Sequence, residues 1–325
     1  MGDAGRVCSE PVDGGIDIYS CPSSSADHLV VMVHGILGSV ADWEFGANQF
    51  VRMLPDKVIV HCSERNMYRL SLDGVDVMGE RLAEEVAEVV KSRPELKKIS
   101  FVAHSVGGLV ASGTICGLEA INFITVATPH LGSRGNKQVP FLFGVTAIEK
   151  VASHVIHWIF GRTGKHLFLT DDDEGKPPLL QRMVDDYDDL CFMSGLQAFK
   201  RRVAYANVGY DHIVGWRTSS IRRNSELPKW EGTLSENYPH IVYEEQSKGS
   251  ITDECADLSL MDGDSDMLEE KLVRGLARVS WERVDVSFHG SRLRYAAHSV
   301  IQAKFSFMHS DGEDVIRHII DHFLL

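Results

Sequence analysis

The sequence predicts an α/β protein with a mostly parallel central sheet flanked by helices. Short apolar runs alternate along the chain with segments of helical periodicity, the pattern that successive β-α-β units produce. Residues 28–33 (HLVVMV) are such a run, and residues 75–90 carry apolar side chains at spacings of three and four. With 325 residues, of which 44% are hydrophobic, the chain is long enough to bury the core that such a sheet requires.

The same patterns place the remaining elements in order. Further strands are expected at 57–62, 98–103, 121–127, 200–208 and 280–288. Besides the helix over 75–90, which Pro94 ends, helices are expected at 105–118, 267–278 and 313–325. Ligands of such sheets bind at the carboxyl ends of the strands, where VHGI, AHSV and ATPH all fall.

We predict a flexible N-terminus over residues 1–25 and a single domain over 26–325. Residues 131–180 are rich in bulky apolar side chains without strand alternation, which predicts a helical cap insertion. Its apolar face is expected to line an acyl-chain pocket or to contact lipid, the alternative being a buried helical layer with no ligand. Residues 244–266 are acidic and poor in bulky apolar side chains, so we expect a mobile loop there.

Composition excludes several classes of protein. A formal net charge of −13 argues against a nucleic-acid partner, because phosphate binding needs clustered basic residues. The chain has no apolar run long enough to span a bilayer and no basic-then-apolar leader. Its six cysteines form no C-x-x-C pair, which favours reduced thiols over a zinc site or a disulfide framework. We therefore expect an intracellular, cytoplasmic protein without metal, cofactor or obligate protein partner, and peripheral membrane contact stays open.

Residues 100–109 (SFVAHSVGGL) place Ser105 at a sharp strand-to-helix corner, between the small residues Ala103 and Gly107. A serine hydroxyl is a weak nucleophile unless a base takes its proton and amides stabilise the resulting oxyanion. Such a corner projects the hydroxyl out of the sheet and aims helix N-terminal amides at the reacting oxygen. Ser105 is therefore the candidate nucleophile, and the amide of Val106 is one candidate oxyanion donor.

The stretch 33–39 (VHGILGS) is predicted to supply the second oxyanion donor. Its glycines allow the backbone to turn closely, so that an amide can face the site. Our candidate is the amide of Ile36, with Leu37 as the alternative. We expect structural roles for His34 and His104.

Four segments together resemble the lipase-like putative serine esterase family of the α/β hydrolases, and its plant members in particular. They are LVVMVHGILGS, FVAHSVGGLVA, NFITVATPHLGS and ANVGYDHIVGWRTSS, and the resemblance extends from about residue 26 to the end. It implies an α/β-hydrolase fold and hydrolysis of carboxylic esters of lipids, such as phospholipids or acylglycerols. The stretch after the corner, GLVASGTICGLEA, is shorter here than in the family.

In α/β hydrolases the chain order is serine, then an acid, then histidine. The family's N-x-x-x-D-x-x-V stretch gives the role of acid to Asp211, which could alternatively cap the following turn. Position after the last strand allows His289 or His298 as base, and the family's A-H-x-x-I pattern favours His298. The expected reaction is ester cleavage through an acyl-enzyme on Ser105. An acyltransferase or thioesterase with the same residues, or a binding protein without activity, are the competing classes.

Overall fold

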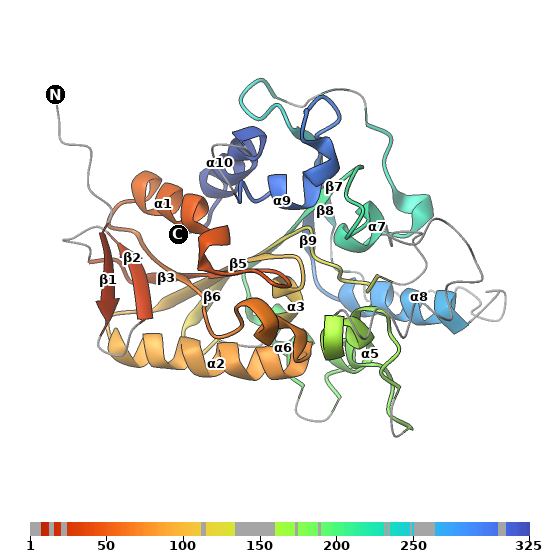
Figure 1. The fold of residues 1–325 in the computed structure, drawn as a ribbon, viewed down its shortest axis with the longest axis horizontal. Helices are drawn as coiled ribbons and strands as arrows, with labels where there is room; N and C mark the ends of the chain where they lie inside the picture. Colours follow the sequence, from red (N-terminus) through yellow and green to blue (C-terminus); the bar gives the residue numbers. More distant parts are fainter. Residues whose placement is uncertain are drawn as a thin grey trace.

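A nine-stranded sheet runs through the part of the chain that the structure, a computed structural model, describes (Figure 1). The described residues are 8–12, 16–20, 25–111, 115–133, 160–172, 175–187, 190–230, 232, 235–247, 249, 264–304 and 310–325. The strands lie in the order β1 (Cys8–Val12), β2 (Ile16–Ser20), β4 (Val58–Cys62), β3 (His28–Val33), β5 (Lys98–His104), β6 (Glu119–Val126), β7 (Arg201–Asn207), β9 (Trp281–Val286) and β8 (Ile241–Ser247). The six strands from β4 to β9 in this order are parallel, and β1, β2 and β8 are antiparallel at the two edges.

The six parallel strands confirm the six predicted from apolar runs. All residues of β3 are buried, and alternate side chains face opposite layers of the protein. Leu29, Val31 and Val33 pack into one core, whereas Val30 and Met32 pack into the other. Burial on both faces explains why this strand reads as an unbroken apolar run.

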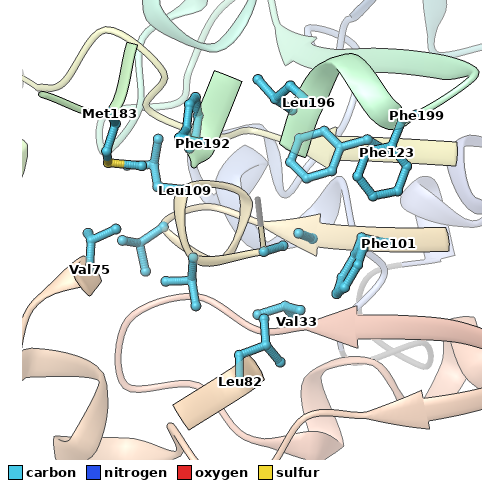
Figure 2. Close-up of a cluster of buried hydrophobic side chains, with 14 of the residues drawn as sticks. Val33, Val75, Leu82, Phe101, Leu109, Phe123, Met183, Phe192, Leu196 and Phe199 are labelled. Carbon is cyan, nitrogen blue, oxygen red and sulfur yellow. The ribbon is translucent and has the colours of Figure 1, made fainter. Parts of the chain in front are cut away.

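Helices cover both faces of the sheet (Figure 1). One layer contains α2 (Val75–Ser92), α3 (Gly107–Val110), α5 (Leu179–Val184), α6 (Phe192–Ala198) and α8 (Asp264–Leu276); the other contains α1 (Glu44–Met53), α9 (Ala297–Val300) and α10 (Glu313–Asp321). Short helical segments are α7 (Trp216–Ser219), η1 (Val40–Asp42), η2 (Tyr68–Leu72), η5 (Asn224–Glu226), η7 (Arg294–Ala296) and η8 (Ser310–Gly312). Figure 2 shows the first core, where Leu82 of α2, Phe101 of β5 and Phe192 of α6 gather.

The helix predicted over 105–118 is wrong in its extent. Among the described residues of this range, Gly107–Val110 is helical as α3 and residues 115–118 form a turn. Cys116 and Gly117 have φ angles of 49° and 77°, in the left-handed region that a right-handed helix cannot contain. The serine corner therefore leads into a single helical turn.

Both sheet edges contain strands that the sequence did not predict. Residues 8–12 and 16–20, expected in a flexible N-terminus, pair with each other, and Ile18 and Tyr19 of β2 pair with β4. Residues 244–247, expected in a mobile loop, belong to β8. Composition did not reveal these strands, because β-structure at a sheet edge depends on pairing with a neighbouring strand. The flexibility of residues 1–25 and of the acidic loop stays a prediction. Residues 134–159 of the cap and 251–263 of the acidic loop lie outside the described residues, and the domain boundaries stay predictions.

Candidate active site

Ser105 occupies a strained corner between β5 and α3. Its φ angle is 54°, a left-handed conformation that costs a non-glycine residue about 1–2 kcal/mol. Two hydrogen bonds hold this backbone in place. The Ser105 amide donates to the Val126 carbonyl (2.9 Å), and the Thr128 hydroxyl donates to the Ser105 carbonyl (2.8 Å). Because both partners belong to or follow β6, the neighbouring strand holds the corner in shape.

Close packing around the corner explains its small neighbours. A Cβ atom on Gly107 would lie 2.7 Å from the His34 carbonyl oxygen and 2.8 Å from that of Val33. A Cβ atom on Gly35 would lie 2.9 Å from Cβ of Ser105. The turn at Ser105 and the loop after β3 therefore approach each other more closely than side chains would allow.

The structure brings Ser105, His298 and Asp211 into one line of hydrogen bonds. Ser105 Oγ and His298 Nε2 are 3.1 Å apart, and His298 Nδ1 and Asp211 Oδ2 are 3.0 Å apart. The carboxylate accepts from Nδ1–H, so Nε2 is free to accept the serine proton. Ser105 follows β5, Asp211 follows β7 and His298 lies in α9, so the three side chains come from separate segments of the chain.

Asp211 is buried and accepts several hydrogen bonds. Besides His298, Oδ2 accepts from Asn207 Nδ2 (2.9 Å), and Oδ1 accepts from the amides of Ile213 (3.1 Å) and Val214 (2.8 Å). Burial acts to raise the pKa of Asp211, but the charge of His298 and these donors outweigh it, and the pKa is lowered. Asp211 thus holds the following turn and also contacts His298, so its contacts are compatible with both alternatives that the sequence left open.

The candidate oxyanion donors differ in whether their amides already form a hydrogen bond within the protein. The Leu37 amide donates to Ser71 Oγ (2.8 Å), which removes it as a donor to a ligand. Within the described part of the chain, the amides of Ile36 and Val106 have no hydrogen-bond partner. Ile36 lines the same cavity as Ser105, and Val106 is the next residue along the corner. The geometry thus favours Ile36 over Leu37.

The other candidate histidines have structural contacts. His104 Nε2 donates to the backbone carbonyl of His298 (2.7 Å), and His34 Nδ1 lies 2.9 Å from the Gly35 carbonyl oxygen. Burial and the neighbouring His298 hold the pKa of His104 well below its usual value, so its ring stays neutral. His289 instead contacts Ser287 Oγ (2.8 Å) through Nδ1, and it is His298 that the structure places beside Ser105.

A cavity of about 340 Å³ opens onto Ser105 and His298. Its lining is largely apolar, and part of it comes from the described end of the predicted cap. The apolar lining side chains include Ile36, Leu37, Phe160, Leu167, Phe168 and Ile213. The lining also contains an ion pair, in which Lys304 Nζ lies 3.0 Å from Asp42 Oδ1. Such a cavity suits a small ligand with an apolar portion.

No group of three or more histidine, cysteine, aspartate or glutamate side chains among the described residues is arranged to hold a metal ion. None of their helices has both the length and the hydropathy needed to cross a bilayer.

The sequence analysis missed two contributors to this site and expected a structural role for His104 without naming its partner. Asn207 supports Asp211, Ser71 engages the Leu37 amide, and His104 contacts the carbonyl of His298. Asn207 could have been found, since it begins the N-x-x-x-D stretch. The roles of Ser71 and His104 depend on contacts across 34 and 194 residues, which no local pattern reveals.

A parallel sheet with antiparallel edges, whose nucleophile-type corner follows the central strand β5, is the fold of the α/β hydrolases. Residues 23–221 match the family described as "Putative serine esterase (DUF676)", and this chain belongs to that family.

Similar proteins include yeast relatives. The chain is 32% identical over 230 residues to "Putative lipase ROG1" of Saccharomyces cerevisiae, covering 63% of this chain and 31% of that protein. It is 30% identical over 229 residues to "Putative lipase C4A8.10" of Schizosaccharomyces pombe, covering 64% of this chain and 28% of that protein. The chain therefore spans about a third of the length of these relatives.

Solved structures with some likeness include two bacterial enzymes. The mature form of Bacillus licheniformis lipase BlEst2 has a TM-score of 0.38 and 18% identity, over 64% of this chain and 75% of that chain. Phospholipase PlaB from Legionella pneumophila, in complex with thio-NAD, has a TM-score of 0.36 and 16% identity, over 57% of this chain and 38% of that chain. At these values the likeness carries no argument about activity.

Proposed function

We propose that this protein is a serine esterase that cleaves carboxylic esters, with Ser105 as nucleophile, His298 as base and Asp211 as the acid that orients His298. The line of hydrogen bonds at 3.1 Å and 3.0 Å through these three side chains carries the proposal. Membership in a family described as serine esterases supports it. The lowered pKa of Asp211 keeps its carboxylate ionised at neutral pH, as orientation of a histidine cation requires.

In the proposed reaction, Ser105 Oγ attacks the ester carbonyl carbon while His298 Nε2 takes the serine proton. The amides of Ile36 and Val106 bind the oxyanion of the tetrahedral intermediate. His298 then gives its proton to the leaving alkoxide, the alcohol departs, and the acyl group remains on Ser105. A water molecule attacks this acyl-enzyme, its proton passes to His298, and the carboxylic acid leaves as Ser105 is restored.

The proposed substrates are lipid esters, such as those of acylglycerols or phospholipids. The apolar lining of the cavity, with Phe160, Leu167 and Phe168 from the end of the cap, supports an acyl-chain site beside Ser105. Two of the yeast relatives carry the name of lipases. An acyltransferase would use the same three residues, because only the acceptor that replaces water would differ.

Labelling with a fluorescent fluorophosphonate tests the nucleophile. We expect the native protein to be labelled and Ser105→Ala to be unlabelled. Ser92→Ala is a matched control, since Ser92 lies at the end of α2 and donates to Val89. Asp211→Asn should lower ester hydrolysis by about 10⁴-fold, because His298 would lose the partner that fixes its tautomer. A folded native protein that resists labelling, or a Ser105→Ala variant labelled like the native one, would refute the proposal.

Ester chain length tests the acyl site. p-Nitrophenyl decanoate should be cleaved with higher kcat/KM than the acetate ester, because the longer chain buries more apolar surface in the cavity. Equal values for the two esters would contradict the assignment of the cavity to an acyl chain. Product analysis with added alcohols separates hydrolysis from acyl transfer.

A further inference from the structure

Large exposed apolar side chains are concentrated around the candidate site. In the described part of the chain, the large apolar side chains that are 44% to 67% exposed are Leu37, Tyr68, Leu70, Tyr187, Ile213, Tyr295, Leu324 and Leu325. Five of these lie on the loops that build the site or directly beside them. Scattered exposed leucines are ordinary on a protein surface, but a gathering at one place indicates contact with a partner.

Three of the five flank the candidate site residues along the chain. Leu37 follows Ile36, Ile213 lies two residues after Asp211, and Tyr295 lies three residues before His298. Leu37 and Ile213 also line the cavity that opens onto Ser105. Their exposure therefore marks the mouth of that cavity. We call Leu37, Tyr68, Leu70, Ile213 and Tyr295 the apolar rim.

Hydrogen bonds join the η2 part of the apolar rim to the loop after β3. The Tyr68 amide donates to the Gly38 carbonyl (2.9 Å), and the Leu37 amide donates to Ser71 Oγ (2.8 Å). Ser71 Oγ in turn donates to the Tyr68 carbonyl (2.5 Å). Leu37 and Tyr68 have φ angles of 55° and 53°, conformations that such residues adopt only when their surroundings hold them there. Hydrogen bonds between the loop after β3 and η2 thus hold these two side chains in their exposed positions.

Ring contacts surround Tyr295, another member of the rim. Tyr295 stacks with His212, with ring centroids 6.4 Å apart and an interplanar angle of 12°. It also meets the ring of Tyr210 edge-on at 5.3 Å, and the Arg294 guanidinium lies 5.1 Å from its ring centre. Tyr295 nonetheless remains more exposed than any other large apolar side chain among the described residues.

The charges within the rim are basic, although the whole chain has a formal net charge of −13. Arg69 stands exposed between Tyr68 and Leu70, and Arg292 stands exposed three residues before Tyr295. Neither forms an ion pair within the part of the chain that the structure describes. By contrast, the nearby Asp73 is paired with Arg81 (2.6 Å). Apolar side chains interspersed with unpaired arginines suit a partner surface that is both apolar and negatively charged.

We propose that the apolar rim binds the surface of a membrane or other lipid aggregate that carries anionic head groups. Leucine and tyrosine side chains of the rim enter the interfacial layer, where tyrosine is favoured, while Arg69 and Arg292 contact phosphate groups. A lipid surface fits better than a docked protein, because the mouth of the cavity lies within the rim and a bound protein would cover it. This choice of occupant rests on the proposed function, since a lipid surface delivers an ester directly into the cavity.

Co-sedimentation with vesicles tests the proposal independently of catalysis. The full chain with Ser105→Ala is mixed with vesicles of phosphatidylcholine, with or without phosphatidylglycerol. We expect binding that increases with phosphatidylglycerol. Tyr68→Asn combined with Leu70→Ser should weaken vesicle binding by about tenfold. Asparagine is chosen because it tolerates the positive φ angle of Tyr68. Arg69→Gln should weaken binding about fivefold, and only to the anionic vesicles.

Leu325→Ser is the matched control. Leu325 is as exposed as Leu70 but lies toward the amino ends of the central strands, away from Ser105, where the neighbouring Leu324 carbonyl accepts from Asn122 Nδ2 of β6. This variant should bind vesicles like the Ser105→Ala parent. Equal effects of the rim variants and Leu325→Ser, or no binding to either vesicle, would overturn the proposal.

A soluble ester separates this proposal from the proposed function. With Ser105 restored, the Tyr68→Asn and Leu70→Ser variant should cleave p-nitrophenyl acetate at the native rate, because neither residue lines the cavity. Loss of that activity would mean that the rim shapes the site rather than binding lipid, and would overturn the assignment. Vesicle binding by a native protein that cleaves no ester would refute the proposed function alone.

Discussion

The imidazole of His104 donates a hydrogen bond through Nε2 to the backbone carbonyl of His298, at 2.7 Å. The two rings also lie against each other, with their centroids 4.5 Å apart. The residue directly before the candidate nucleophile thus holds the backbone of the candidate base. This contact links the end of β5 to α9 directly beside Ser105.

We expect His104→Phe to lower kcat of ester hydrolysis about ten- to a hundredfold, with KM little changed. Phenylalanine keeps a ring against His298 but donates no hydrogen bond, so the base can shift, and small displacements of reacting groups are costly. His104→Gln, which retains a side-chain donor, should recover part of the lost kcat. The measurement is steady-state kinetics on a soluble ester, and a native kcat in His104→Phe would contradict this role.

Gly107→Ala should destabilise the protein by about 2 kcal/mol and reduce fluorophosphonate labelling, because its Cβ would press on two backbone carbonyl oxygens that cannot move away. Gly79→Ala in α2 is the matched control. The nearest atom to its Cβ would be 3.7 Å away, and alanine favours helix, so we expect a gain of up to about 1 kcal/mol. Urea unfolding of both variants measures these free energies. Similar changes in the two would show that the corner has no special steric demand.

Acid should destabilise the fold at a pH where most carboxylates are still ionised. Burial lowers the pKa of His28 to about 4 and that of His130 to about 3, below the value of about 6.5 in the unfolded chain. Between these limits the unfolded state binds more protons than the folded state, so stability falls as the pH falls below about 6.5. His28 and His130 should each lower the free energy of unfolding by about 2 kcal/mol between pH 7 and pH 5.

The free energy of unfolding, measured in urea at pH 7 and pH 5, checks this expectation. His28→Gln, which cannot titrate, should show a smaller loss between the two pH values than the native protein. A native protein equally stable at both values would contradict neutral burial of these histidines.

Arg222→Met should destabilise the protein by about 3–5 kcal/mol. Arg222 is fully buried and donates to both carboxylate oxygens of Asp285 (2.9 and 2.8 Å), which would be left as an unpaired buried acid. Arg65→Met is the comparison, since Arg65 pairs with Glu84 and Glu88 at the exposed surface and should cost less than about 1 kcal/mol. Thermal or urea unfolding of the two variants measures the difference, and equal losses would refute this reasoning.

The local sequence pattern was sufficient to predict the central strands, α2 and the corner at Ser105. These elements carry their own signature, because burial on both faces demands unbroken apolar strands and a half-buried helix repeats every three or four residues. The small residues Ala103 and Gly107 likewise reveal the corner, since a larger side chain at Gly107 would collide with the strand beside it. The edge strands β1, β2 and β8 carry no such signature, because a strand at a sheet edge depends mainly on pairing with its neighbour.

The sequence by itself determined the fold class, the serine at its corner and a short set of partners for that serine. Only the tertiary structure shows that His298, and not His289, lies beside Ser105, and that the amide of Leu37 is already engaged by Ser71. The physical reason is distance along the chain: Ser105 and His298 are 193 residues apart, and Leu37 and Ser71 are 34 apart. Which groups meet at a site depends on how strands and loops pack, and no local propensity contains that information.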